Sequence, residues 1–198
     1  MNIDESFDDE KHEYRKRGAL VDSVTDVLRD NGFINPQFYT EEGKLRGKIV
    51  HAVTEGLDRG LVLDWSTLHP DLHGYVRSWL KLKALLHPEF LDIEVPRFHP
   101  LFPVAGTLDR RVLVQGWECI WDIKTGPAPK WAAFQTAAYD LMLPPYERGR
   151  RKRAAIVLHE DGATATVVPH QEYNDGNCFV AFLTSTLTRR THGIRKDR

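Results

Sequence analysis

The chain has 198 residues, about the size of one domain with a modest extension. Hydrophobic residues make up 41% and charged residues 28%, close to globular averages, which disfavours a disordered or low-complexity protein. Two cysteines are too few for a four-cysteine zinc site or an iron–sulfur cluster, and a disulfide framework is not expected. No apolar run approaches the roughly 18 residues of a membrane span, and the acidic start is unlike a signal peptide, so we expect a soluble cytoplasmic protein.

The formal net charge of −1 hides an asymmetry along the chain. Residues 1–147 carry 17 basic and 23 acidic side chains, a net of −6, whereas residues 148–198 carry 10 basic and 5 acidic, a net of +5. The basic excess gathers at residues 148–153 and in the tail from residue 189. Such clusters can bind phosphate groups, but a solvated turn and a frayed terminus would give the same pattern.

The first half of the chain has the pattern of helices. Ser23 and Asp26 resemble a capping box at the start of a short helix. Apolar residues at helical spacing predict longer helices at residues 43–59 and 71–87. Residues 1–17 are mostly charged, and we expect them to be a flexible N-terminal segment.

Strands and helices then alternate. The patterns predict strands at 91–98, 104–114 and 118–124, a helix at 130–143, a hairpin of 154–159 with 164–169, and a final helix at 176–190. This order predicts an α/β (α+β) fold with a central mixed β-sheet flanked by helices. One domain would cover residues 18–192, followed by a basic tail at 193–198.

Five polar residues close together in the sequence could form one chemical site. Asp122 and Lys124 project from the same face of a core-like strand, and Asp109 lies on the strand before it. Two carboxylates are the minimum site for Mg²⁺ or Mn²⁺, beside which a lysine could handle water or phosphate charge. Gln135 and Tyr139 lie one turn apart on the next helix and can reach this site. Each of these residues also has an ordinary interpretation. Asp122 and Lys124 could form a simple ion pair, Asp109 could be a turn residue, and Gln135 and Tyr139 could be ordinary helix residues.

Taken in order, these residues resemble the motifs of the PD-(D/E)XK nuclease superfamily. The motifs read Gly106-x-x-Asp109, Asp122-x-Lys124-Thr-Gly126 and Gln135-x-x-x-Tyr139, preceded by Arg46-Gly47-x-x-x-His51, which is similar to the RecB-like exonuclease branch and its small phage-type members. The resemblance covers roughly residues 20–190. Leu108 stands where the superfamily has its proline, and two cysteines leave no place for the iron–sulfur cluster of some relatives.

The resemblance implies an αβββαβ core, here with an N-terminal helical extension, and a role for each motif residue. Asp109, Asp122 and the main-chain carbonyl of Ile123 would hold Mg²⁺ or Mn²⁺, with His51 joining them or lying just behind them. Lys124 would orient or deprotonate the attacking water. Gln135 and Tyr139 would position Lys124 and the DNA backbone.

Further candidates lie outside the motifs. Glu94 could supply another carboxylate to the metal or be a solvated edge residue, and His51 could simply pair with Glu55. Contacts to DNA are expected among Arg46, Arg110, Arg111, Trp131, Arg148, Arg150, Arg151, Lys152 and Arg153. The histidines outside the motifs, His99 among them, lack zinc-type spacing and are expected at the surface or in capping positions.

The implied function is a divalent-metal-dependent deoxyribonuclease, with an exonuclease as the leading hypothesis. It would act in recombination, repair or phage DNA processing, in the cytoplasm of a bacterium or a phage-infected host. The expected partners are DNA and a recombination or single-strand-binding protein, without a membrane or ATP, since no phosphate-binding loop motif is present. The alternatives are a nuclease-fold module that binds DNA or a partner without cutting, and an endonuclease or RNA-directed member of the superfamily.

Overall fold

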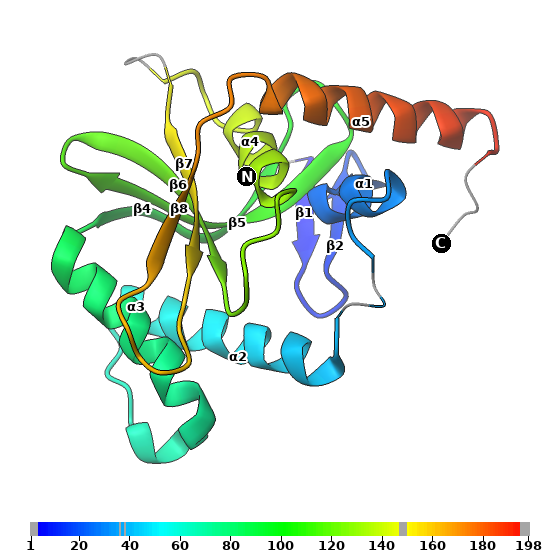
Figure 1. Cartoon of the computed structure of the whole chain (residues 1–198). Coiled ribbons are helices and arrows are strands. Elements are labelled where there is room, and N and C mark those ends of the chain that lie inside the picture. Colours follow the sequence, from blue (N-terminus) through cyan, green and yellow to red (C-terminus); the bar gives the residue numbers. More distant parts are fainter. Residues whose placement is uncertain (1–3, 36, 38, 147–149, 195–198) are drawn as a thin grey trace.

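The computed structural model describes residues 4–35, 37, 39–146 and 150–194. It confirms the predicted class, since a central mixed sheet is flanked by helices (Figure 1). The strands are β1 Glu5–Asp8, β2 Glu13–Lys16, β3 Ala19–Ser23, β4 Glu89–Phe98, β5 Val104–Val114, β6 Trp117–Lys124, β7 Lys152–Val157 and β8 Thr166–His170. The helices are α1 Val24–Asp30, α2 Glu41–Asp58, α3 His73–Leu86, α4 Ala132–Leu141 and α5 Asp175–Thr191. None of these described helices has the length and apolar character needed to cross a membrane.

Strand β5 is the centre of the sheet. It pairs antiparallel with β4 and with β6, and its first residues pair parallel with β3. Gln115 and Gly116, both with positive φ (49° and 76°), make the tight β5–β6 turn. Helix α4 then returns the chain so that β7 lies parallel to β6, and β8 closes this edge antiparallel to β7.

Two hydrophobic cores lie on opposite faces of the sheet. Helices α2 and α3 pack on one face, where Trp79 and Ile123 are buried. Helices α1, α4 and α5 cover the other face, where Ile120 and Tyr139 are buried (Figure 1). Consecutive β6 residues therefore alternate between the two cores, as strand geometry requires.

The predicted helices and strands are confirmed, with ends shifted by two residues or fewer. The capping box of α1 is also present: the Asp26 amide donates to Ser23 Oγ at 3.1 Å, and the Ser23 amide donates to Asp26 Oδ2 at 3.0 Å. Strand β3, directly before this cap, was not predicted. The tail prediction for residues 193–198 falls mainly on residues outside those described.

The prediction of a flexible N-terminal segment is wrong for the described residues. Strands β1 and β2 form an antiparallel hairpin that joins the sheet through β3. Phe7 stacks on Tyr14 with ring centroids 4.6 Å apart, and Tyr14 is only 1% exposed because it packs against Phe98. The Tyr14 hydroxyl is also hydrogen-bonded to Thr107 Oγ1 of β5 at 2.8 Å. Two aromatic side chains thus anchor a segment whose other residues are mostly charged.

Gly106 on β5 is required by close packing of α4. A Cβ atom at this position would lie 2.8 Å from Cε1 of Tyr139 and 3.1 Å from Cγ2 of Val24. We expect Gly106→Ala to lower the free energy of unfolding by about 1–3 kcal/mol, the usual cost of overpacking, in urea denaturation. Gly126→Ala is the matched control, because a Cβ there meets nothing within 4 Å; equal stability of the two variants would contradict the packing argument.

His99 makes the stability of the fold depend on pH. The residue is 6% exposed, and its Nδ1 accepts hydrogen bonds from the amides of Leu101 and Phe102, each at 3.1 Å. His99 therefore caps this turn and does not lie at the surface. Burial, assisted by the charge of Lys16, lowers the pKa of His99. As the pH falls through about 6.5, the unfolded chain binds a proton that the folded chain resists, so stability decreases until the folded pKa is reached.

We therefore expect wild-type protein to lose more stability between pH 7.5 and pH 5.5 than the His99→Gln variant. Urea denaturation at both pH values measures this difference. If both proteins lose the same free energy of unfolding between the two pH values, His99 is not the cause of the pH dependence.

Candidate functional site

The site forms where β5 and β6 part. Their main-chain pairing ends at Arg110 and Trp121. Beyond this pair the carboxylate of Asp109 replaces the main-chain acceptor: its Oδ2 accepts a hydrogen bond from the Ile123 amide at 2.7 Å. The parting opens the middle of the sheet between the α2 and α4 faces, so side chains from both faces can meet there.

Three potential metal ligands converge at this opening. His51 comes from α2, Glu94 from β4 and Asp109 from β5, and one ligand atom from each lies within 4.8 Å of the others. His51 Nδ1 is 3.2 Å from Glu94 Oε1 and 3.8 Å from Asp109 Oδ2, while Nε2 is 3.1 Å from the carbonyl oxygen of Ile123. The structure therefore brings together His51, Glu94, Asp109 and the Ile123 carbonyl.

The electrostatics of this cluster fit a divalent cation. Burial raises the pKa of Asp109 despite the nearby His51. Burial alone would lower the pKa of His51, but the charges of Asp109 and Glu94 outweigh it and raise the pKa to about 9. Two carboxylates, an imidazole and a main-chain carbonyl gathered this closely form a donor set that can hold a divalent cation.

Glu94 reaches the cluster because β4 is distorted at this residue. Its φ is +48°, a left-handed conformation that is rare for a residue other than glycine, particularly within a strand. Such backbone persists only where surrounding contacts hold it. Here the Glu94 carboxylate contacts both His51 and Arg110, which favours the metal-site alternative for Glu94 over a solvated edge position.

Asp122 and Lys124 form a second group next to the cluster, on the α4 side. Lys124 Nζ lies 2.7 Å from Asp122 Oδ2 and donates to Gln135 Oε1 at 3.3 Å. Gln135 Nε2 in turn donates to the Tyr139 hydroxyl at 2.9 Å. Asp122 is not among the three ligands that lie within 4.8 Å of one another in the described part of the chain, so its role in metal binding stays a prediction.

The surroundings of this second group fix its protonation states. Burial disfavours the charged form of Lys124, but the carboxylates of Asp122 and Asp109 outweigh this and raise its pKa. Burial raises the pKa of Asp122, and burial raises the pKa of Tyr139 well above its usual value. Lys124 is therefore a cation and Tyr139 a neutral phenol at physiological pH.

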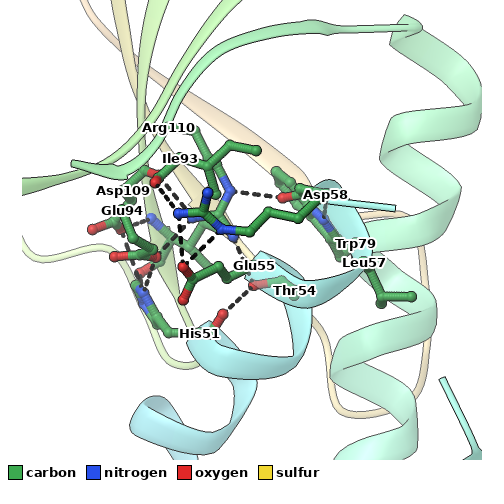
Figure 2. A network of polar contacts seen from close by, with 12 residues as sticks. His51, Thr54, Glu55, Leu57, Asp58, Trp79, Ile93, Glu94, Asp109 and Arg110 are labelled. Atoms are coloured by element: carbon green, nitrogen blue, oxygen red, sulfur yellow. Dashed lines mark hydrogen bonds and ion pairs between the residues drawn. The ribbon is translucent and has the colours of Figure 1, made fainter. Parts of the chain in front are cut away.

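A buried ionic network lies behind Glu94 and Asp109 (Figure 2). The side chain of Arg110 is completely buried, and its Nη1 donates at 2.7 Å both to Glu94 Oε1 and to the Asp109 carbonyl. Its Nε donates at 2.6 Å to Asp58 Oδ2, and Asp58 also accepts from Lys83 and Trp79. Asp58 was missed by sequence reasoning, because a charged residue at the end of a helix gives no signal that it is buried.

Several predicted DNA contacts are wrong because the side chains are buried in ion pairs. Arg110 serves the network just described. Arg151 is held by Glu118, Asp140 and the Pro144 carbonyl, and Arg153 by Asp175 and the Ala133 carbonyl. Alternation along the chain explains this, since Arg151, directly before β7, and Arg153 within it are buried, while Lys152 between them is exposed.

The other residues predicted to contact DNA lie in different surroundings. Arg111 pairs with Asp92 at 2.7 Å and with Glu118 at 3.4 Å, so it is engaged within the protein. The exposed Arg150 and Lys152 lie over the rings of Tyr173 and Trp117, and Arg148 lies outside the described residues. Arg46 and Trp131 line a cavity of about 390 Å³ together with Lys124, beside the metal-ligand cluster.

Arg110 should set the metal affinity of the cluster by holding Glu94 in place. We expect Arg110→Lys to weaken Mn²⁺ binding about 10-fold or more, the usual effect of removing a partner that orients a ligand. Isothermal titration calorimetry measures the affinity, with urea denaturation to verify folding. Arg111→Lys is the matched control, because its ion pairs point to Asp92 and Glu118; equal affinities in the two variants would contradict the role of Arg110.

Comparisons with known proteins give little beyond this geometry. No protein-family model matches the chain, and no curated protein matches it. Among solved structures it is similar to LHK-Exo in complex with dAMP, with 13% identity, a TM-score of 0.33, and 88% of this chain and 95% of that chain covered. A second structure, an alkaline exonuclease (LHK-Exo) from Laribacter hongkongensis, gives 12% identity, a TM-score of 0.31, and coverage of 87% and 94%. With TM-scores below 0.5, function has to be argued from the site residues themselves.

Proposed function

We propose that this protein is a divalent-metal-dependent nuclease of the PD-(D/E)XK superfamily, in its RecB-like branch, that hydrolyses DNA phosphodiester bonds from a strand end. The observation that carries the proposal is the convergence of His51, Glu94 and Asp109 at the parting of two strands, with Lys124 on the adjacent strand. Three of these residues, His51, Asp109 and Lys124, belong to the sequence motifs that resemble that superfamily, and Glu94 lies outside the motifs.

The cluster would hold Mg²⁺ or Mn²⁺ through His51, Glu94, Asp109 and the Ile123 carbonyl, with Asp122 as a further ligand. When bound, the metal supplies a Lewis acid for the phosphoryl oxygens and lowers the pKa of a bound water. Arg110 fixes the orientation of Glu94, and the Ile123 amide fixes that of Asp109. The protein thus contributes ligands that are already oriented.

Lys124 would act as a fixed positive charge. Its ammonium group lies 2.7 Å from the Asp122 carboxylate, so it is suited to orient water and to offset charge that builds on the phosphoryl group. Gln135 accepts a hydrogen bond from Lys124 and is itself held by the Tyr139 hydroxyl. This chain of contacts limits the positions that the ammonium group can take.

The biological setting follows from the resemblance alone. We propose DNA as the substrate and recombination, repair or phage DNA processing as the process, in the cytoplasm of a bacterium or phage-infected host. A recombination or single-strand-binding protein is the proposed partner.

The nuclease activity can be tested with purified protein and DNA in Mg²⁺ or Mn²⁺. We expect linear DNA to be degraded, EDTA to abolish the reaction, and Asp109→Asn or Lys124→Ala to lower the rate by about 10²–10³-fold or more. The first variant weakens the metal site, and the second removes a positive charge beside the reacting phosphate. Asp71→Asn is the control carboxylate, since its side chain is 79% exposed and is paired only with the exposed His69 in the described structure.

Comparing linear, nicked and circular substrates in the same assay distinguishes an exonuclease from an endonuclease. Degradation restricted to DNA with ends supports the proposed exonuclease. Full activity in Lys124→Ala, or activity that survives EDTA, would refute the proposed chemistry.

A further inference from the structure

The two sides of the candidate site differ in charge. On the hairpin side, a cavity of about 730 Å³ has a charged lining that consists mainly of carboxylates. They come from Asp9, Glu10, Glu55, Glu94 and Asp109, and the other charged or titratable lining residues are Lys48, His12, His51 and Tyr14, with Tyr139. On another side of the site, two cavities of about 390 and 320 Å³ share Tyr39 and Trp131 as walls. The described residues that line these two cavities include Arg29, Lys44, Arg46 and Lys124 but no carboxylate. A polyanion is therefore favoured on one side only.

The shared walls of the basic side are aromatic. Tyr39 is 42% exposed, and the half-buried ring of Trp131 lies 5.4 Å from Lys124 Nζ. We call this continuous surface the Tyr39–Trp131 groove. Aromatic rings within a basic groove are the means by which proteins bind single-stranded nucleic acid, because every base has a face that can stack. Each of the two cavities lies within the usual size range of a small-molecule site.

Arg46 offers this groove an unused positive charge. Arg29 and Lys44 are paired with Asp26 and Glu41 at 2.8 and 2.6 Å. Arg46, in contrast, has no carboxylate partner among the described residues, and its Nε is buried without a hydrogen-bond partner. Its guanidinium lies over the ring of Tyr75, with 5.6 Å to the centroid. Arg46 lines the groove, so the positive charge of its guanidinium group is placed to attract a phosphate.

The hairpin of β1 and β2 closes the other end. Asp9 and Glu10 lie in its turn and line the acidic cavity. The stacked Phe7 and Tyr14 and the Tyr14–Thr107 hydrogen bond hold the hairpin against β5. A strand that reached the metal ligands from the groove would meet fixed negative charge beyond them, which repels a continuing phosphate backbone.

We propose that the Tyr39–Trp131 groove binds single-stranded nucleic acid, with a base stacked on Trp131, a phosphate at Arg46, and the strand ending at the hairpin. This inference rests on the proposed function for the identity of the reacting centre and adds the form of the substrate. It assigns to Tyr39, which the motifs do not include, a direct contact with the substrate.

Binding can be measured apart from cleavage. The probe is a twelve-residue oligothymidylate with an internal fluorophore, followed by anisotropy in EDTA at low salt. We expect Trp131→Ala and Tyr39→Ala each to weaken binding by roughly 5- to 100-fold, the range that base stacking spans, and Trp131→Phe to restore much of it. Trp117→Ala is the matched control, because this partly exposed tryptophan lies at the far end of β6.

Arg46→Gln should weaken binding and make it less dependent on salt, because one phosphate contact is lost. Equal affinity of all variants, no binding by the wild type, or equal binding of a blunt duplex would overturn the proposal. Because the assay contains no metal, it measures binding in the groove independently of cleavage. A failure of the groove proposal is therefore distinguishable from a failure of the proposed nuclease activity. A protein that binds the probe through Trp131 but never cuts would refute only the proposed function.

The hairpin is tested by the double variant Asp9→Asn, Glu10→Gln. We expect it to bind a thirty-residue oligothymidylate more tightly than the wild type does, while affinity for a six-residue probe stays unchanged, because only the longer strand reaches the acidic turn. An unchanged ratio of the two affinities would overturn the proposed closed end.

Discussion

The hydrogen bond from the Ile123 amide to the Asp109 carboxylate is the contact on which the site depends. Without it, β5 and β6 would either continue their pairing, which would close the sheet, or part and leave a buried amide without an acceptor. The side chain of Asp109 replaces the missing strand partner. One residue thus opens the sheet, satisfies the backbone that opening exposes, and presents a carboxylate beside His51 and Glu94.

Concentrating this much charge inside a small domain is possible only because every buried charge in the network has an opposite partner. Arg110 neutralises Glu94 and is itself held by Asp58, which also binds Lys83. Lys124 does the same for Asp122. Removing one member of such a set leaves an uncompensated buried charge, so the network favours a single arrangement of the ligands. The near-neutral total charge of the chain is therefore no argument against binding a polyanion, since charge is arranged locally.

Sequence reasoning succeeded where the period of an element determines which way a side chain points. The two-residue spacing of Asp122 and Lys124, and the one-turn spacing of Gln135 and Tyr139, placed these four side chains correctly on their elements. The strand predicted in the region of β7 began at residue 154, so alternation was not applied to Arg151 and Arg153. The run of basic residues suggested a solvated turn or a DNA contact, whereas both side chains are buried in ion pairs. The network of Asp58 and Arg110 joins residues 52 positions apart, and no local pattern predicts that contact.

The N-terminal hairpin shows how the remaining failure arose and why it matters. Charge density suggested a flexible segment, yet two aromatic side chains are enough to attach it, because Tyr14 is fully covered and hydrogen-bonded to β5. Their burial places Asp9 and Glu10 of the hairpin turn in the same cavity as the candidate metal ligands Glu94 and Asp109. The charged residues that suggested disorder thereby become a boundary of the site. A polar surface of this kind needs only a small apolar anchor to acquire a defined position, and composition alone cannot distinguish the anchored segment from a loose one.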